Sequence, residues 1–366
     1  MPSAPVRLVH LPAEVDVNPY TRLLYGALGR FGFELVPEGR FSLSWLWRSR
    51  RDVDVLHFHW CPNDFYEYRG PRASLRVPLS WLRLPSFVAR LAAARTLGYR
   101  VVWTIHEVYP HGSASPRLDR LAAIALARLS SVLFAHDVAT ADRARAELGH
   151  AAAEIAIVPH GSYVGFYPAG RPREAVRREL GVASGAFVFL CFGSVKPYKE
   201  IERLIEVFRS LSRRDVALVV AGTVRDRRTG DAILAAAAAD PRIVPRLGLV
   251  PDGGVAELYG AADAAVLPRS DGWTSGSLIL ALSSGVPVVA ARTAVYEELT
   301  GGGAAGWLFE PGDPDGLSAA LDAAAADIRL AHDKGRAALE LASRLRWEET
   351  AARTAARIAP AVAARS

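Results

Sequence analysis

Lysine is the residue that this sequence most clearly lacks. The chain has 366 residues and 44 lysines and arginines, yet only three of these are lysine, at positions 196, 199 and 334. An excess of alanine and arginine over lysine is typical of a GC-rich bacterial genome, so the formal net charge of +6 indicates only compatibility with anionic partners. Lys196 and Lys199, which lie three residues apart, therefore mark a position where lysine itself is required.

Cysteines and long apolar runs are also scarce. Two cysteines, Cys61 and Cys191, provide no disulfide framework, which favours a reducing compartment. The N-terminus has no apolar signal region, and no apolar run reaches the ~20 residues that span a bilayer. With 51% hydrophobic and 22% charged residues the chain is of the globular class. We expect a cytoplasmic protein, and any membrane binding would be peripheral, at the inner face of the membrane.

Short apolar segments alternate with helical patterns along the whole chain. This alternation predicts α/β architecture with parallel sheets covered on both faces. The expected strands form two series, 6–11, 54–59, 100–106, 131–136 and 156–159, then 187–192, 217–221, 242–247, 264–267 and 287–290. The expected helices are 20–31, 85–97, 117–129, 201–211, 231–239 and 277–284.

A segment rich in Gly, Pro and Tyr, 159–172, separates the two series and is the expected linker. The prediction is a doubly wound domain over 1–165, a second over 166–345, and a C-terminal helix over 346–366 that crosses back to the first. Doubly wound domains bind ligands outside the carboxyl ends of their strands, so a cleft between the two domains is the expected active site.

The two lysines follow the expected strand 187–192. Gly193 ends that strand, and Pro197 permits only the first turn of the helix that follows. Two ammonium groups beside the free N–H groups of a helix start form an outline of a phosphate site. Two solvated surface lysines are the alternative.

A second strand-to-helix turn carries small hydroxyl residues. After the strand 264–267 come Gly272 and then Thr274, Ser275, Gly276 and Ser277 at the start of a helix. Exposed N–H groups next to glycine let a phosphate approach the backbone closely. A simple N-cap turn would use the same hydroxyls.

Together these motifs resemble the nucleotide-sugar-binding domain of the family 4 glycosyltransferases of the GT-B fold. The resemblance covers 187–350 and lies in the segments 192–199, 221–222, 248–251, 259–268 and 281–289. It implies a sugar transfer from a nucleotide diphosphate sugar to a hydroxyl acceptor, with retention at the anomeric carbon and without metal. It also implies the donor-site residues, which are Lys196, Lys199, Gly193, Ser194, Thr274, Ser275, Gly276 and Ser277 around the diphosphate, and Val250 at the base.

One departure from the family concerns the ribose. The family carries a pair of glutamates across this loop and helix, and the second position falls here on Leu280. Leucine cannot accept a hydrogen bond from a hydroxyl. The ribose must be held in another way, and a catalytically silent nucleotide-sugar-binding subunit is one alternative function. A GT-B sugar-phosphate synthase is another.

The N-terminal half supplies the expected acceptor side. His106 directly follows the strand 100–106, and by the resemblance it contacts the transferred sugar and is catalytic; a capping or core histidine is the alternative. The other expected acceptor-side residues are Asn18, Tyr20, His59, Trp60 and His111. Histidines 57 and 59 share a face of a strand, but no further ligand cluster completes a metal site, and we expect no metal and no cofactor.

The segment 64–90 mixes five arginines with Tyr66, Tyr68, Trp81 and Leu82. Such a mixture suits an anionic membrane that presents a lipid-linked acceptor, and it equally suits a solvated helix. Fingerprints of P-loop NTPases, nicotinamide dehydrogenases and serine hydrolases are missing, and the dispersed basic residues do not indicate nucleic-acid binding. A hexosyltransferase is the activity that the family resemblance implies.

Overall fold

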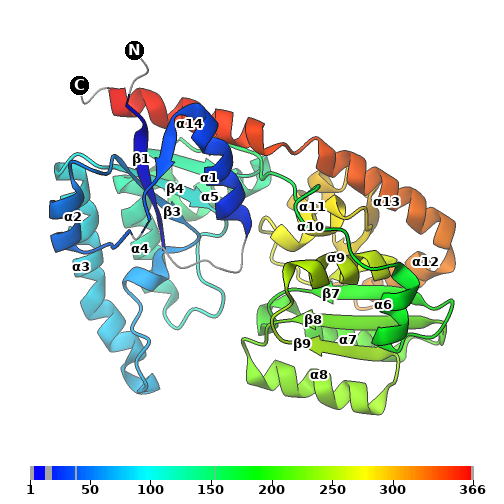
Figure 1. The fold of residues 1–366 in the computed structure, drawn as a ribbon. Helices are drawn as coiled ribbons and strands as arrows, with labels where there is room; N and C mark the ends of the chain where they lie inside the picture. The colour runs from blue at the N-terminus through cyan, green and yellow to red at the C-terminus, as the bar shows by residue number, and fades with distance from the viewer. Residues whose placement is uncertain (1–3, 13–18, 38, 153, 364–366) are drawn as a thin grey trace. The chain divides into compact units, whose positions relative to one another are not determined.

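The computed structural model describes residues 4–12, 19–37, 39–152 and 154–363, and its contacts divide the chain into two compact units. Unit 1 comprises Met1–Gly161 and Leu345–Ser366, and unit 2 comprises Ser162–Arg344 (Figure 1). The sequence-based boundary lay at residue 165, a few residues beyond the division at Gly161. Each unit is described by itself.

The described residues of unit 1 form a six-stranded parallel sheet in the order β2-β1-β3-β4-β5-β6. Its strands are β1 Val6–Leu11, β2 Phe33–Leu35, β3 Val55–His59, β4 Arg100–Ile105, β5 Val132–Ala135 and β6 Ala156–Ile157. The prediction missed β2, because an edge strand of three residues with only Phe33 buried has no visible alternation.

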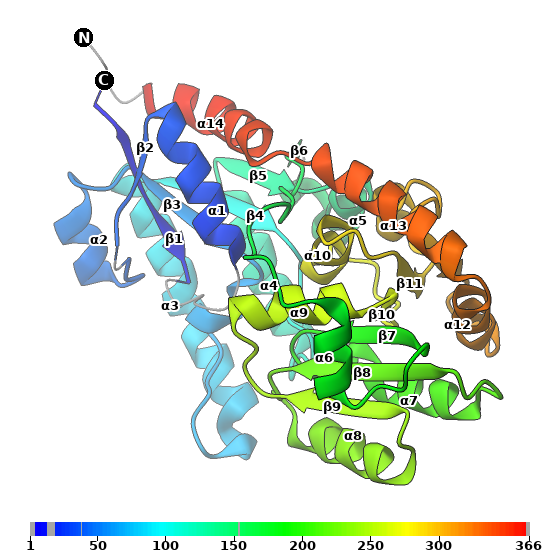
Figure 2. The same cartoon turned by 45° about the vertical axis from the view of Figure 1, so that its right-hand side comes forward.

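One face of this sheet is covered by α1 (Pro19–Leu28) and α14 (Trp347–Ala363), which lie side by side in both views (Figures 1 and 2). The core there joins Leu24 and Leu28 of α1 to Ala351 and Ile358 of α14. The last helix thus belongs to the core of unit 1, since its apolar face packs on the same face of the sheet as α1.

The remaining helices of unit 1 are α2 Leu43–Ser49, α3 Arg76–Thr96, α4 Pro116–Leu129 and α5 Val138–Leu148. The predicted start of α3 at residue 85 is wrong, because Pro85 lies inside the helix. The buried residues Leu84, Phe87 and Leu91 recur at helical spacing across it. Burial of this face outweighs the one backbone hydrogen bond that proline removes.

Unit 2 holds a second parallel sheet in the order β12-β11-β10-β7-β8-β9. Its strands are β7 Phe187–Phe192, β8 Val216–Gly222, β9 Ile243–Leu247, β10 Ala264–Leu267, β11 Val288–Ala291 and β12 Gly306–Phe309. The chain winds one way from β7 to β9 and the other way from β10 to β12. The reversal leaves a crevice at the carboxyl ends of β7 and β10.

The helices of unit 2 are α6 Arg173–Leu180, α7 Ile201–Ser210, α8 Arg227–Ala239, α9 Asp252–Ala261, α10 Gly276–Ser283, α11 Ala294–Leu299, α12 Gly316–Ala326 and α13 Ile328–Ser343. Alternate residues of β7, such as Phe187 and Phe189, pack against Leu204 and Phe208 of α7. The predicted α/β class, with two parallel sheets, is confirmed.

Candidate functional site

A pocket of unit 2 opens where β7 and β10 end, at the reversal of strand order. Its polar lining comes from Lys199, Arg269, Ser275 and Ser277, and its apolar floor from residues such as Tyr259. The position agrees with the rule that ligands of doubly wound sheets bind at this point.

Lys199 ends a short 3₁₀ turn, Pro197–Lys199, between β7 and α7. Its Nζ donates a hydrogen bond to the carbonyl oxygen of Phe192 at 3.4 Å. Burial lowers the pKa of Lys199 to about 8; Cys191 opposes this shift, and the nearby Arg269 and Lys196 add to it. A bound anion would stabilise the protonated form of this lysine and raise its pKa again, because a nearby opposite charge favours the ammonium.

Gly193 permits Lys199 to approach the backbone. Gly193 has a φ of +115°, and a Cβ on it would lie 2.6 Å from Lys199 Nζ and 3.4 Å from Ser277 Oγ. A side chain at this position would therefore displace the ammonium group. The three groups converge, so the strand end, the lysine turn and the start of α10 form one cradle.

Glu200 joins the two loops of the cradle. It has a left-handed φ of 55°, and its carboxylate accepts hydrogen bonds from the N–H of Ser270 at 3.1 Å and from its hydroxyl at 2.8 Å. The other carboxylate oxygen accepts from Arg203 at 3.1 Å. The turn after β7 is thereby fixed to the loop after β10.

Arg269 is a polar residue of the pocket that sequence reasoning missed. It follows β10, is 8% exposed, and forms an ion pair with Asp271 at 2.5 Å. Its guanidinium lies 5.3 Å from the ring centroid of Tyr198. Lys196, which was the predicted second cation, lies 5.9 Å from the same ring and is not part of the pocket lining. The only sequence signal for Arg269 is a charged residue two positions after a buried strand.

The hydroxyl residues at the start of α10 take two different structural roles, helix capping and pocket lining. Ser275 is the N-cap of α10 and accepts from the N–H of Leu278 at 3.4 Å, as the alternative interpretation required, and it also lines the pocket. Ser277 lines the pocket beside Gly193. Thr274 and Gly276 lie in the same turn, partly buried.

The remaining predicted donor-side residues lie around this cradle. Ser194 follows Gly193 and is partly buried, and Val250 lies partly exposed between β9 and α9. Leu280 is only 6% exposed within α10. Its apolar side chain offers no polar atom to a ribose.

Unit 1 contains a buried cluster of histidines at the carboxyl ends of β3 and β4. His59 ends β3, His106 follows β4, and His59 Nδ1 lies 3.4 Å from His106 Nε2. Burial lowers the pKa of both imidazoles well below the usual value, and neighbouring histidines lower them further. The two rings are therefore neutral at physiological pH.

Trp60 is held over His106 by an unusual backbone. Its φ is +58°, which is strained for a bulky residue, and its carbonyl oxygen accepts a hydrogen bond from the indole N–H of Trp103 at 2.6 Å. The indole of Trp60 stacks on His106 with ring centroids 5.0 Å apart and an interplanar angle of 20°. Tyr20, only 1% exposed, meets the same imidazole edge-on at 4.9 Å.

Two predicted acceptor-side residues lie elsewhere. His111 is outside the buried cluster and faces Glu107 at 3.8 Å. Asn18 lies outside the described residues. In the described parts of the chain, no three or more His, Cys, Asp or Glu residues are grouped so that they could hold a metal ion.

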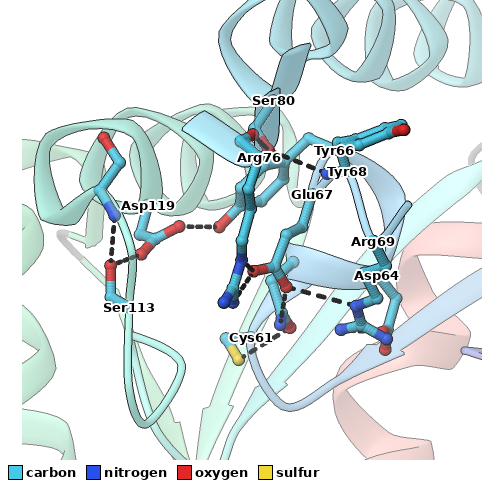
Figure 3. A network of polar contacts seen from close by, with 12 residues as sticks. Cys61, Asp64, Tyr66, Glu67, Tyr68, Arg69, Arg76, Ser80, Ser113 and Asp119 are labelled. Atoms are coloured by element: carbon cyan, nitrogen blue, oxygen red, sulfur yellow. Dashed lines mark hydrogen bonds and ion pairs between the residues drawn. The ribbon is translucent and has the colours of Figure 1, made fainter. Parts of the chain in front are cut away.

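The segment that mixes arginine with aromatic residues is tied together by its own polar contacts (Figure 3). Glu67 accepts hydrogen bonds from Arg69 at 3.3 Å and from Arg76 at 2.7 Å, and the hydroxyl of Tyr66 donates to Asp119 at 2.6 Å. Arg69 also pairs with Asp64 at 2.5 Å, so that two carboxylates face these two arginines within unit 1. Of the helices that the structure describes, none is both long and apolar enough to cross a membrane.

Comparisons with known proteins agree with this arrangement. A family profile described as "Glycosyl transferases group 1" matches residues 186–327, which include the whole pocket of unit 2. The GDP-mannose:glycolipid 4-beta-D-mannosyltransferase of Xanthomonas campestris is 29% identical over 301 residues, which cover 80% of this chain and 75% of that protein. The D-inositol 3-phosphate glycosyltransferase of Geodermatophilus obscurus is 32% identical over 224 residues, 58% of this chain and 49% of that protein.

Two solved structures share the fold over almost the whole chain. The Anabaena protein Alr3699/HepE, in complex with UDP and glucose, superposes with a TM-score of 0.73 at 16% identity and covers 97% of this chain and 100% of its own. Sucrose-phosphate synthase of Thermosynechococcus elongatus gives 0.69 at 17% identity, with 99% and 100% coverage. At these identities the likeness establishes the fold, which is GT-B.

Proposed function

Because this chain is a glycosyltransferase of the GT-B fold, with a group 1 glycosyltransferase domain at 186–327, we propose that it transfers a hexose from a nucleoside diphosphate sugar to a hydroxyl acceptor. The observation that carries the proposal is the cradle of unit 2, in which Lys199 and Ser277 converge on Gly193 beside the start of α10. Positive charge and free N–H groups of a helix start match the diphosphate that leaves with the donor.

In this proposal the protein itself stabilises the leaving diphosphate. Negative charge grows on the phosphate oxygens as the bond to the sugar breaks, and Lys199 and Arg269 supply charge-assisted hydrogen bonds to it. Asp271 keeps the guanidinium of Arg269 in place. The reaction then needs no metal ion, and we expect transfer to continue in excess EDTA.

The acceptor side of the proposal lies in unit 1. His106 would contact the transferred sugar, with Trp60 and His59 fixing its ring. The names of the mannosyltransferase relatives include GDP-mannose and a glycolipid, which support a mannosyl donor and a lipid-linked acceptor here.

The stereochemical course is the finer part of the proposal. The family resemblance favours retention, whereas the relatives' name specifies a beta linkage, which an alpha-linked donor can give only by inversion. The one-bond ¹³C–¹H coupling constant at the anomeric carbon of the product decides between the two.

We also propose peripheral membrane binding, because a lipid-linked acceptor would be presented at a membrane surface. In α3, Leu82 is 74% exposed and Trp81 39% exposed, beside arginines of the same helix. Exposed apolar side chains next to arginine suit an anionic bilayer. Leu82→Asp should reduce sedimentation with vesicles of phosphatidylglycerol and phosphatidylcholine. The control is Leu234→Asp, which changes another exposed leucine, in α8, and should leave sedimentation unchanged.

Thermal unfolding with UDP-, GDP- and dTDP-sugars tests the donor site. The matching nucleotide at ~100 times its dissociation constant should add about 2.7 kcal/mol to the free energy of unfolding. The buried Leu280 favours one second candidate, a silent donor-binding subunit. Consumption of the donor only when a glycolipid acceptor is present supports the transferase, and tight binding without turnover supports the silent subunit.

A further inference from the structure

Five buried polar side chains from α1, β3 and β4 form one continuous hydrogen-bond chain in unit 1. Thr104 Oγ1 lies 2.8 Å from His57 Nε2, and the hydroxyl of Tyr25 lies 3.0 Å from His57 Nδ1. The same hydroxyl lies 2.7 Å from His59 Nε2, and His59 Nδ1 lies 3.4 Å from His106 Nε2. His106 stands at the end of the chain.

Each hydrogen bond in this series has a donor and an acceptor, and the protonation of the three histidines decides which atom is which. Burial lowers the pKa of His57 to about 3 and lowers the pKa of His59 and His106 well below the usual value, so the three rings are neutral. A neutral imidazole has one N–H and one bare nitrogen, and each hydroxyl has one proton. In a neutral histidine that is hydrogen-bonded at both nitrogens, the direction of one bond therefore determines the direction of the other.

The distances fit donation towards His106. Hydrogen bonds from a hydroxyl donor are shorter, about 2.7–2.8 Å, than those from an N–H donor, about 2.9–3.0 Å. The short contacts, at 2.8 Å and 2.7 Å, are those in which Thr104 donates to His57 and Tyr25 donates to His59. The 3.0 Å contact is the one in which His57 Nδ1–H donates to Tyr25. All three agree with donation towards His106.

We infer that this chain keeps the proton of His106 on Nδ1, so that His106 acts in the reaction as a hydrogen-bond donor and not as a base. The inference rests on the proposed function, in which His106 contacts the transferred sugar. His106 Nε2 accepts from His59, and only the Nδ1–H remains for a ligand. That group fits an accepting oxygen, on a sugar hydroxyl or a phosphate, and it cannot remove a proton from the acceptor. Tyr25, His57, His59 and Thr104 are positioning residues.

The other groups that face His106 do not alter this direction. His136 and His160, whose pKa values burial also lowers, have Nδ1 atoms 2.9 Å from the carbonyl of Val158 and 2.6 Å from that of Gly161. Their N–H groups are thus directed to the backbone. Tyr20 and Trp60 meet the imidazole through their rings, at 4.9 Å and 5.0 Å.

The tautomer is measured directly on the full chain with ¹⁵N-labelled histidine, by long-range ¹H–¹⁵N correlation spectra in which His106→Gln identifies the His106 signals. We expect a neutral ring protonated on Nδ1. A ring protonated on Nε2 would overturn the inference. Tyr25→Phe removes only the hydroxyl that donates to His59, so both tautomers of His106 should then be populated.

The same variant links the tautomer to the reaction. We expect kcat for transfer to fall in Tyr25→Phe in proportion to the His106 rings that lose the Nδ1–H, by about twofold when the two tautomers are equally populated, with little change in the KM for the donor. Tyr99→Phe is the matched control, because it removes another buried hydroxyl, bonded at 2.7 Å to the carbonyl of Leu46 in the same unit. An unchanged rate in Tyr25→Phe would overturn the inference. If Tyr25→Phe does not fold, Thr104→Val makes the same test at the start of the chain.

The proposed function and this inference fail differently. Full transfer by His106→Ala would overturn the role of His106 in the reaction, whatever its tautomer. Loss of transfer in His106→Ala with a wild-type His106 protonated on Nε2 would overturn the donor assignment alone.

Discussion

Lys199 is the residue on which the proposed donor site should depend most. Its Nζ lies at the point where a Gly193 side chain would stand, within the pocket, whereas Lys196 is outside the lining. Lys199→Ala should therefore lower kcat/KM by about 100-fold or more, the usual loss for one transition-state donor. Lys196→Ala is the matched control and should lose much less. Calorimetry with UDP and GDP should show the same ranking in affinity, and equal affinities in both variants and the wild type would refute the site.

The pKa of Lys199 gives the donor site a pH dependence. Burial lowers this pKa to about 8 in the unliganded protein. Below that pH the ammonium binds the diphosphate as it stands, and above it each binding event must first take up a proton. Affinity for the nucleoside diphosphate should thus fall by up to about tenfold per pH unit above 8. Lys199→Arg, whose guanidinium stays charged, should remove this dependence, and a wild-type affinity that is constant from pH 7 to 9.5 would contradict it.

At the scale of elements, the connection between β7 and α7 is held in shape by Glu200. The left-handed φ of 55° costs about 1 kcal/mol in a non-glycine residue, and the carboxylate returns this through its bonds to Ser270. Glu200→Gly relieves the strain but frees the lysine turn from the loop after β10. We expect the melting temperature to change little and nucleotide affinity to fall by about tenfold, since a hydrogen bond to a charged group is worth ~1.5–3 kcal/mol. Glu200→Gln, whose amide oxygen can still accept from Ser270, should keep most of the nucleotide affinity. If Glu200→Gln lost as much affinity as Glu200→Gly, the bonds to Ser270 would be irrelevant.

The elements that could be read from the sequence are those defined by local pattern. β7 and β10 were predicted to the residue, because an apolar run between a turn and a glycine or proline defines both ends. β12 was missed, since four residues that include Gly306 give no strand signal, and α3 was cut at Pro85 because proline ends most helices.

The side chains that sequence reasoning missed are those whose role depends on distant neighbours. Arg269 belongs to the pocket only because β10 pairs with β7, and no local pattern announces that pairing. His57 and His59 were predictably on one face of a strand, but their link to Tyr25 depends on α1 covering β3. Residues on neighbouring strands and helices come together only through the topology, which the sequence encodes non-locally.

At the scale of the whole molecule, the proposed diphosphate-binding residues and His106 belong to different units of the chain. The diphosphate cradle around Lys199 lies in unit 2, and His106 lies in unit 1 among the buried histidines. Contacts to the diphosphate therefore remain when His106 is removed. His106→Ala should lower the transfer rate by about 100-fold while the affinity for the nucleoside diphosphate stays within a factor of about two.

Lys199→Ala should show the opposite order, with loss of affinity accompanying loss of rate. Both variants are compared in the full-length chain, with transfer to a glycolipid acceptor measured at saturating donor and nucleotide affinity measured by calorimetry. A full rate in His106→Ala would remove His106 from the reaction. A loss of diphosphate affinity in His106→Ala as large as its loss of rate would mean that unit 1 holds the diphosphate. A contact confined to the transferred hexose cannot contribute to the affinity for a nucleoside diphosphate, which lacks that hexose.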